Sequence, residues 1–173
     1  MNEILGDQAP ETEQDGQHAK PVTAPRTLGE VGLNHFAPYL MNRIMGRYNE
    51  SLREKLTRSG LSVAKMRALA VLSVVDGLMI NELSVYSVIE QSTLSRTLDA
   101  MEKEGLIHRK ASEQDNRVRH IFLTEAGRAA FAQMWPHMRD EYTAMFEGVS
   151  QAEHDAFLMT LRKVLTNIRK HDF

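Results

Sequence analysis

One interruption in an otherwise helical pattern constrains the fold most. Apolar residues recur at steps of three and four along most of the chain after residue 36, but this spacing stops at Leu106. Leu106 and Ile107 precede the polar segment HRKASEQDNRVRH, which runs into the apolar residues IFL. Two short apolar runs joined by a charged loop are typical of a β-hairpin of about 15 residues. We therefore expect a mainly α-helical protein that carries one small hairpin, over residues 108–122.

Six helices are expected around the hairpin, each from an apolar stripe at helical spacing. They cover residues 37–57, 63–75, 81–88, 89–104, 124–147 and 151–170. Glu90 opens the fourth helix, where a negative charge suits the helix dipole. Thr124 is a suitable N-cap for the fifth helix, which Pro136 can kink. Asp76-Gly77 is a turn signal between the second helix and the third.

The chain contains no cysteine, which excludes disulfides, thiolate metal sites, cysteine nucleophiles and thiol-based oxidant sensing. Hydrophobic residues make up 42% of the chain and charged residues 25%, the ordinary profile of a soluble globular protein. The first residues, MNEILGDQAPETEQDGQ, lack the basic start and apolar core of a signal peptide. No apolar run reaches the roughly 20 residues of a transmembrane helix. We therefore expect a cytoplasmic protein without a membrane partner.

The net charge of −2 is unevenly distributed along the chain. Residues 1–30 contain six acidic and two basic residues, so they carry −4 and the rest of the chain carries +2. This acidic stretch also contains three prolines and shows no apolar periodicity. We expect it to be a mobile tail, followed by a single domain over residues 31–173. Because DNA binding requires only a local basic face, the overall charge does not exclude it.

Residues 81–104 combine two short helices and a tight turn, and the second helix is polar on its outer face. With the charged hairpin that follows, this order is typical of a winged helix-turn-helix, here over residues 61–123. The major groove of DNA, about 12 Å wide, admits one helix, and small hydroxyl side chains near its start let it approach the bases. Arg96 can then reach guanine O6 and N7, or a phosphate. The candidate DNA-binding residues of this helix are Gln91, Ser92, Thr93, Ser95 and Arg96.

The hairpin supplies a second set of candidate DNA contacts. Its tip carries Arg117 and Arg119, which can enter a minor groove or bind phosphates. Four basic residues oppose two acidic residues between positions 107 and 120, so this segment carries +2 before its histidines are counted. They are Arg109, Lys110, Arg117 and Arg119 against Glu113 and Asp115.

Two blocks of sequence resemble the MarR/SlyA family of winged helix-turn-helix transcriptional regulators. The stretch IEQSTLSRTLDAMEKEGLI, residues 89–107, is similar to the recognition helix of that family. The stretch DNRVRHIFLTEAG, residues 115–127, matches the family's wing pattern of Asp-x-Arg followed by Leu-Thr-x-x-Gly. The spacing of the two blocks and the order of the flanking helices also fit, so the resemblance covers about residues 33–170. It implies a DNA-binding regulator and not an enzyme.

The resemblance also implies roles for single residues. Arg96 falls on the recognition-helix arginine, and Arg117 falls on the wing arginine that family members place in the minor groove. Asp115 falls on the wing aspartate thought to orient that arginine. Two positions depart from the family pattern, because Val88 stands where glycine is usual and Ser92 where proline is frequent. We expect these departures to change the turn geometry and the base preference, not the fold.

The outer helices are long for one small DNA-reading lobe, and packing on that lobe alone would leave apolar surface exposed. A two-fold dimer would bury this surface and match an inverted repeat in double-stranded DNA. The resemblance implies the same arrangement, with dimerisation helices over residues 33–58 and 124–171. Within these ranges, residues 36–57, 124–147 and 151–170 are expected to form the interface.

The resemblance further implies a ligand-responsive repressor that needs no cofactor. In family members a small anionic or aromatic effector often lies between the first helix and the DNA-binding lobe. The candidate effector-binding residues are His35, Tyr39 and Arg43, which share one face of a helix at steps of four. An arginine and a histidine suit a carboxylate or phosphate, so we expect an acidic or aromatic effector, such as an aromatic acid or its CoA thioester.

Several alternatives stay open at this point. Arg96 could form a surface ion pair with Asp99, which is worth about 0.2–0.5 kcal/mol. Tyr39 could be a core residue. The whole chain could be a ligand-binding or protein-interaction dimer that does not bind DNA. A small enzyme acting at His35, Tyr39 and Arg43 is the remaining class, although the sequence has no Gly-rich phosphate loop and no Gly-x-Ser-x-Gly.

Seven histidines raise the question of a metal site. His120, His137, His154 and His171 recur every 17 residues, but on a helix this spacing places neighbours over 20 Å apart, by the rise of about 1.5 Å per residue. No HxxxH or HxxH pair offers a local chelate. We therefore expect no metal.

Overall fold

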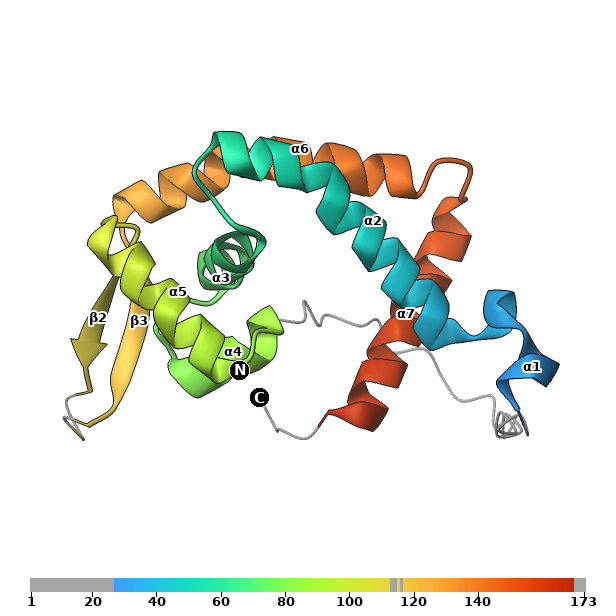
Figure 1. The fold of residues 1–173 in the computed structure, drawn as a ribbon, viewed down its shortest axis with the longest axis horizontal. Coiled ribbons are helices and arrows are strands. Elements are labelled where there is room, and N and C mark those ends of the chain that lie inside the picture. The colour runs from blue at the N-terminus through green and yellow to red at the C-terminus, as the bar shows by residue number, and fades with distance from the viewer. Residues whose placement is uncertain (1–26, 113–114, 116, 170–173) are drawn as a thin grey trace. The chain divides into compact units, whose positions relative to one another are not determined.

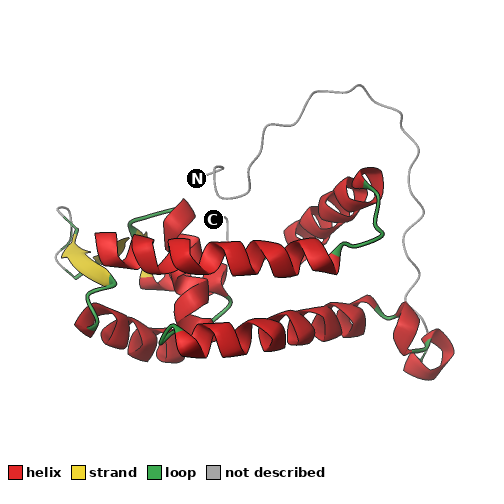
Figure 2. Cartoon of the chain, turned by 90° about the horizontal axis from the view of Figure 1, so that it is seen from above, coloured by secondary structure: helices red, strands yellow, loops and turns green. Residues whose placement is uncertain are grey.

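The computed structural model describes residues 27–112, 115 and 117–169. The expected acidic tail lies outside these residues except for its last four. By its internal contacts the chain divides into two compact units, whose described residues are those from 27 to 51 and those from 52 to 169. Helices account for most of the described chain, and the strands are confined to one small sheet (Figures 1 and 2). The expected fold class, mainly helical with a small wing, is confirmed. The finer domain boundaries stay predictions.

The first unit contains two short turns of helix and the start of a long helix. Helix α1 (Leu28–Val31) and the 3-10 turn η2 (Leu33–His35) precede helix α2 (Ala37–Arg58), which continues into the second unit. The long helix was expected and the two short turns were not. Exposed apolar side chains mark this unit, at Leu28, Leu33, Phe36, Leu40, Ile44 and Met45.

The second unit is built around helix α3 (Val63–Val74). This helix is apolar on nearly all sides, as a helix surrounded by others must be. It contacts α4 (Ile80–Ser87), α5 (Gln91–Lys103), α6 (Glu125–Met145) and strand β3 (Arg119–Leu123). The buried core of this unit consists mainly of leucine, with Leu52, Leu56, Leu69, Leu72, Leu83, Leu94, Leu98, Met101, Ile107, Ile121 and Met134 almost fully covered.

The hairpin belongs to a three-stranded antiparallel sheet. Strands β2 (Ile107–Ala111) and β3 form the expected hairpin, with Ile107 opposite Leu123 and Ala111 opposite Arg119. We call residues 107–123 the wing. A third strand, β1 (Leu78–Met79), pairs with the other side of β3 and was not expected. It is only two residues long and shows no alternation that a sequence pattern could reveal.

The turn before β1 is tied to the wing by polar contacts. Asp76 accepts a hydrogen bond from the backbone N–H of Leu123 at 2.9 Å and pairs with Arg128 at the start of α6. The N–H of Gly77 donates to the carbonyl of Ile121 at 2.9 Å. The Asp76-Gly77 turn was expected, but its contacts with a segment more than 40 residues later were not.

The Leu-Thr-x-x-Gly pattern forms the joint between the wing and α6. Thr124 is the N-cap of α6, as expected, and accepts a hydrogen bond from the N–H of Gly127 at 3.1 Å. Its hydroxyl donates to the carbonyl of Gly105 at 2.6 Å. A side chain at Gly127 would overlap the carbonyl oxygen of Leu106, so only glycine fits at this crossing. Pro136 lies inside α6, which remains one continuous helix.

Helix α7 (Gln151–Ile168) follows α6 and begins with a capping box. Ser150 and Glu153 exchange side-chain and backbone hydrogen bonds at its first turn. The six expected helices are all confirmed to within two residues at each end. Among the described helices, none combines the length and the apolar character that crossing a bilayer requires.

Candidate nucleic-acid interface

Helices α4 and α5 are joined by a tight turn whose first residue is in the left-handed region. Val88 follows α4 with φ 53° and ψ 49°, and its side chain is 78% exposed. The turn is closed by reciprocal bonds, because the N–H of Ile89 donates to Ser84 and the Ser84 hydroxyl donates to Ile89. A β-branched residue is strained in this conformation, which glycine adopts freely. The position where the family usually has glycine therefore keeps a glycine-like backbone here.

The start of α5 is capped by Glu90. Its carboxylate accepts a hydrogen bond from the N–H of Thr93 at 3.1 Å and one from the Ser92 hydroxyl. The hydroxyl of Ser92 is the largest cause that lowers the pKa of Glu90, and the backbone N–H groups of Ser92 and Thr93 lower it further. Glu90 is thus a carboxylate at neutral pH.

The buried face of α5 determines which of its residues point outward. Leu94, Leu98 and Met101 are fully buried, and they anchor the helix against the core. The predicted DNA-binding residues lie on the remaining surface of the first turns. Gln91, Ser92, Thr93 and Arg96 are exposed, and Ser95 is half-buried.

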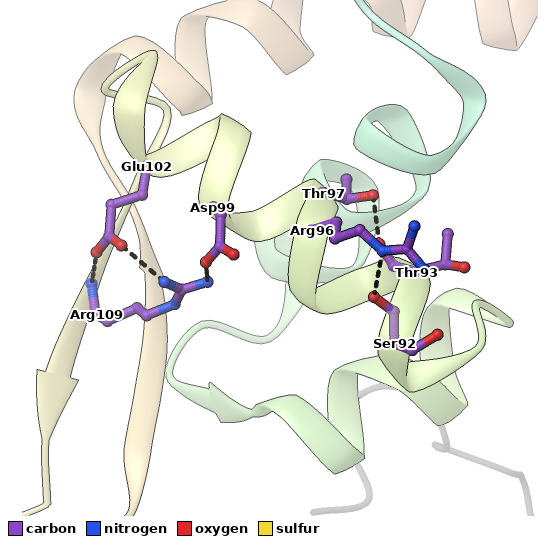
Figure 3. A network of polar contacts seen from close by, with 7 residues as sticks. All are labelled: Ser92, Thr93, Arg96, Thr97, Asp99, Glu102 and Arg109. Atoms are coloured by element: carbon purple, nitrogen blue, oxygen red, sulfur yellow. Dashed lines mark hydrogen bonds and ion pairs between the residues drawn. The ribbon is translucent and has the colours of Figure 1, made fainter.

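Among the residues that the structure describes, Arg96 bonds only to the backbone of its own helix. Its Nε donates to the carbonyl of Ser92 at 3.4 Å, and nearby Thr97 donates to the carbonyl of Thr93 at 2.9 Å (Figure 3). The alternative of an ion pair with Asp99 is wrong, because Asp99 pairs with another arginine. Within the described part of the chain, Arg96 makes no ion pair, so its guanidinium remains available to a partner.

Arg109 in strand β2 fastens the wing to α5. Its guanidinium pairs with Asp99 at 2.7 Å and with Glu102 at 2.9 Å, and Glu102 also accepts from the Arg109 backbone N–H at 3.1 Å (Figure 3). The sequence pattern counted Arg109 among the cations of the hairpin that could meet DNA. In the structure its charge is instead balanced by two carboxylates of the neighbouring helix.

The tip of the wing is organised by Asp115. Its carboxylate accepts a hydrogen bond from the backbone N–H of Arg117 at 2.9 Å, and its carbonyl accepts from the N–H of Val118 at 2.9 Å. This bond joins the carboxylate of Asp115 to the backbone of Arg117, and the orienting role that the family resemblance implies for Asp115 stays a prediction. The side chains of Arg117 and Arg119 are exposed. Glu113, which entered the charge count of the hairpin, lies outside the described residues.

The candidate effector residues are only partly on one helix. Tyr39 and Arg43 lie on α2, where Arg43 donates to the Tyr39 hydroxyl at 3.3 Å and its guanidinium lies 5.9 Å from the ring centre. His35 lies in η2, before α2 begins, so the argument that all three share one helical face is wrong for His35. Tyr39 is half-buried, while His35 and Arg43 are exposed.

No group of three potential metal ligands is found among the residues described, a set that does not include His171. His120 instead bonds through Nδ1 to the carbonyl of Gly77 at 2.8 Å. His154 contacts the Tyr142 hydroxyl and the ring of Phe146. These two histidines thus take part in local hydrogen bonds and ring contacts.

Residues 61–118, which include α3, α4, α5 and most of the wing, match the model of the MarR family. A MarR-family transcriptional regulator from Silicibacter pomeroyi is 53% identical, with a TM-score of 0.81 over 86% of this chain and 100% of the other. This chain belongs to the MarR family. Like its relatives, it is a transcriptional regulator and not an enzyme.

Two further relatives extend the comparison within the MarR family fold. The transcriptional repressor IacR of Pseudomonas putida is 26% identical over 133 residues, which are 77% of this chain and 80% of IacR. BpsR of Bordetella bronchiseptica, whose DNA binding is regulated by 6-hydroxynicotinic acid, has a TM-score of 0.65 at 23% identity. That alignment covers 73% of this chain and 96% of BpsR. At this identity the likeness to BpsR is one of fold.

Two parts of this MarR-family interface were missed by the sequence pattern. One is the pairing of Arg109 with Asp99 and Glu102. The sequence did contain a signal for it, since two acidic residues three positions apart precede a strand that contains basic residues. The other is the bond between Glu90 and Ser92, since Glu90 was considered only for its effect on the helix dipole. Both involve acidic residues next to the candidate DNA-binding side chains.

Proposed function

We propose that this MarR-family regulator represses transcription by binding an inverted-repeat DNA site, with α5 in the major groove and the wing on the flanking DNA. One observation carries this proposal. The first turns of α5 expose hydroxyl, amide and guanidinium groups, and the wing tip exposes arginines, while Arg109 is paired with carboxylates within the fold.

The exposed arginines of α5 and of the wing tip would have different tasks. Arg96 is fixed to its own helix through Nε, which leaves its terminal nitrogens free to bond guanine O6 and N7 in the major groove. Arg117 follows the Asp115 turn at the wing tip and would enter a minor groove, with Arg119 near the phosphates. Gln91, Ser92, Thr93 and Ser95 would complete the base and phosphate contacts from α5.

A homodimer would place two such surfaces on the two halves of the repeat. Exposed apolar residues along α6 and α7 support this part of the proposal. They include Trp135, Tyr142, Met145, Phe157, Met159, Val164, Leu165 and Ile168. Apolar surface of this extent on helices is typical of an interface. We infer that α2, α6 and α7 each contribute to dimerisation, and the two-fold symmetry of the dimer would set the spacing of the half-sites.

A small acidic or aromatic effector would release the DNA. BpsR, which shares the fold, has its DNA binding regulated by 6-hydroxynicotinic acid. Tyr39 and Arg43 are in contact and offer a ring and a cation, a combination that suits an aromatic carboxylate. His35, on the preceding turn, would be a third contact. The effector needs only about 1–3 kcal/mol of differential affinity for the two states of the dimer.

Selection of bound duplexes from a genomic fragment library tests the DNA-binding part. We expect one inverted repeat to be enriched and its affinity to fall steeply when the salt concentration is raised. Absence of both enrichment and salt dependence, with a normal dimer, would favour a ligand-binding or protein-interaction module without DNA binding.

The effector part is tested on the selected duplex with benzoate and 6-hydroxynicotinate as probes and benzamide as the neutral control. We expect the acids to release the DNA, and Arg43→Gln to need higher concentrations of them. If neither acid releases the duplex, the acidic effector class is wrong, while the DNA-binding part stands on the selection.

A further inference from the structure

At the start of α5, a hydrogen bond between two side chains decides whether either of them can still donate a hydrogen bond to a DNA base. Glu90 is exposed, and its Oε2 contacts the Ser92 hydroxyl and the N–H of Thr93. An ionised carboxylate has no hydrogen to give, so the Ser92 hydroxyl must be the donor. The only hydrogen of that hydroxyl is then directed at Glu90.

This bond changes what Ser92 can offer to DNA. With its hydrogen engaged, the Ser92 oxygen can only accept hydrogen bonds from a base. Glu90 itself can only accept as well, and each oxygen has further lone pairs beyond those used by Ser92 and Thr93. Glu90 and Ser92 thus present acceptors at the start of α5, whereas Arg96, one turn later, presents donors.

We propose that Glu90 is a specificity-determining residue which, together with Ser92, selects cytosine at one position of each half-site. Cytosine presents its N4 amino group in the major groove, and this donor suits an edge that only accepts. Thymine and guanine present oxygen acceptors there, and adenine presents N7 beside its amino group, so all three meet the carboxylate less favourably. The inference rests on the proposed placement of α5 in the major groove.

A capping role alone is the competing explanation for Glu90, and the chain contains a matched control for it. Glu153 at the start of α7 accepts from the Ser150 hydroxyl at 2.6 Å and from the Ser150 N–H at 2.9 Å. The same kind of bond lowers the pKa of Glu153. Glu153 therefore reproduces the local chemistry of Glu90 on a helix that is not proposed to read bases.

The test compares base preferences of the full-length protein and its variants in a duplex library randomised across the selected repeat. Glu90→Gln keeps the shape and an acceptor for the Thr93 N–H, but its amide also presents donors. We expect the wild type to prefer cytosine over thymine at one position about tenfold, and Glu90→Gln to reduce this preference below about threefold. Ser92→Ala should relax the same position in part, and Glu153→Gln should leave every position unchanged.

Two outcomes would overturn the inference. Identical base preferences for the wild type and Glu90→Gln would reduce Glu90 to a cap. A uniform gain in affinity for all duplexes in Glu90→Gln, with unchanged preferences, would show only the loss of a negative charge near the phosphates. If the wild type itself enriches no repeat, the proposed DNA binding fails first, which is a distinguishable result. Should Glu90→Gln not fold, Ser92→Ala carries the same comparison.

Discussion

Arg109 and Arg96 are the same kind of residue in the same small region, yet their surroundings are opposite. Arg109 is only 25% exposed and contacts two carboxylates of α5. Arg96 is exposed and bonds, within the described ranges, only to a backbone carbonyl. The first arginine links the wing to α5, and the second is left for a partner. The residues that join the wing to the helices and the residues that would contact DNA are thus separate sets. Measurements of stability should report on the first set and measurements of DNA binding on the second.

The wing is also joined to α6, and this second joint can be broken most severely at Gly127. Because an alanine Cβ would overlap the carbonyl oxygen of Leu106, Gly127→Ala should lower the free energy of unfolding by about 3 kcal/mol or more. Urea unfolding followed by circular dichroism measures this loss. Gly46→Ala on α2 is the control, since nothing lies near its Cβ and it should stabilise by about 0.5–1 kcal/mol. Equal behaviour of the two variants would contradict the close crossing of α6 and the wing.

DNA binding can be weakened at Arg96 without disturbing the contacts that hold the wing. Arg96→Ala removes no ion pair, so unfolding in urea should change by less than about 0.5 kcal/mol. Binding to the selected duplex should weaken by about 1–3 kcal/mol, with relaxed preference at one base pair, if Arg96 contacts guanine. Fluorescence anisotropy on matched and single-mismatch duplexes measures both effects. A loss that is uniform across sequences would instead assign Arg96 to a phosphate.

The reverse pattern is expected at Arg109. Arg109→Gln removes both ion pairs and leaves Asp99 and Glu102 without their cation, so unfolding should cost about 1–2 kcal/mol less. The loss is moderate because both carboxylates are partly in contact with solvent, which screens the interaction. The affinity of Arg109→Gln for the duplex should fall less than that of Arg96→Ala. Arg109→Lys should restore the lost stability only in part. A larger loss of affinity than of stability would place Arg109 on the DNA.

The turn between α4 and α5 offers a change in the opposite direction. Val88→Gly relieves the left-handed strain of a β-branched residue, while the exposed side chain contributes little burial. After allowing for the added entropy of glycine in the unfolded chain, we expect a gain of about 0.5–1 kcal/mol in urea unfolding. Val88→Ala, which keeps a Cβ, should gain less than the glycine variant. A loss in Val88→Gly would mean that the valine side chain has an unrecognised partner.

The sequence predicted the helices and strands better than the contacts between them. Helix ends followed from apolar spacing and capping residues such as Thr124, because these signals are local. The partners of Arg109 depend on which way β2 folds back along α5, and no local pattern encodes that direction. His35 was misplaced because one 3-10 turn shifts it off the helix. The family pattern indicated the positions of Arg96 and Asp115, but their proposed roles on DNA still require the binding measurements.

The smallest expected effect concerns Glu90, the carboxylate that caps α5. The pKa of Glu90 is lowered in the folded state, chiefly by the Ser92 hydroxyl, so its contribution to stability is complete above its ordinary pKa. This contribution is lost as the pH falls from that value through the folded pKa. Glu90→Gln should therefore flatten the fall of stability with acid, as measured by urea unfolding at a series of pH values between about 6 and 3. Glu153→Gln should flatten it in the same way, because the two carboxylates share this chemistry. If the two variants behave alike here but differ in base preference, Glu90 acts at the DNA and not only as a cap.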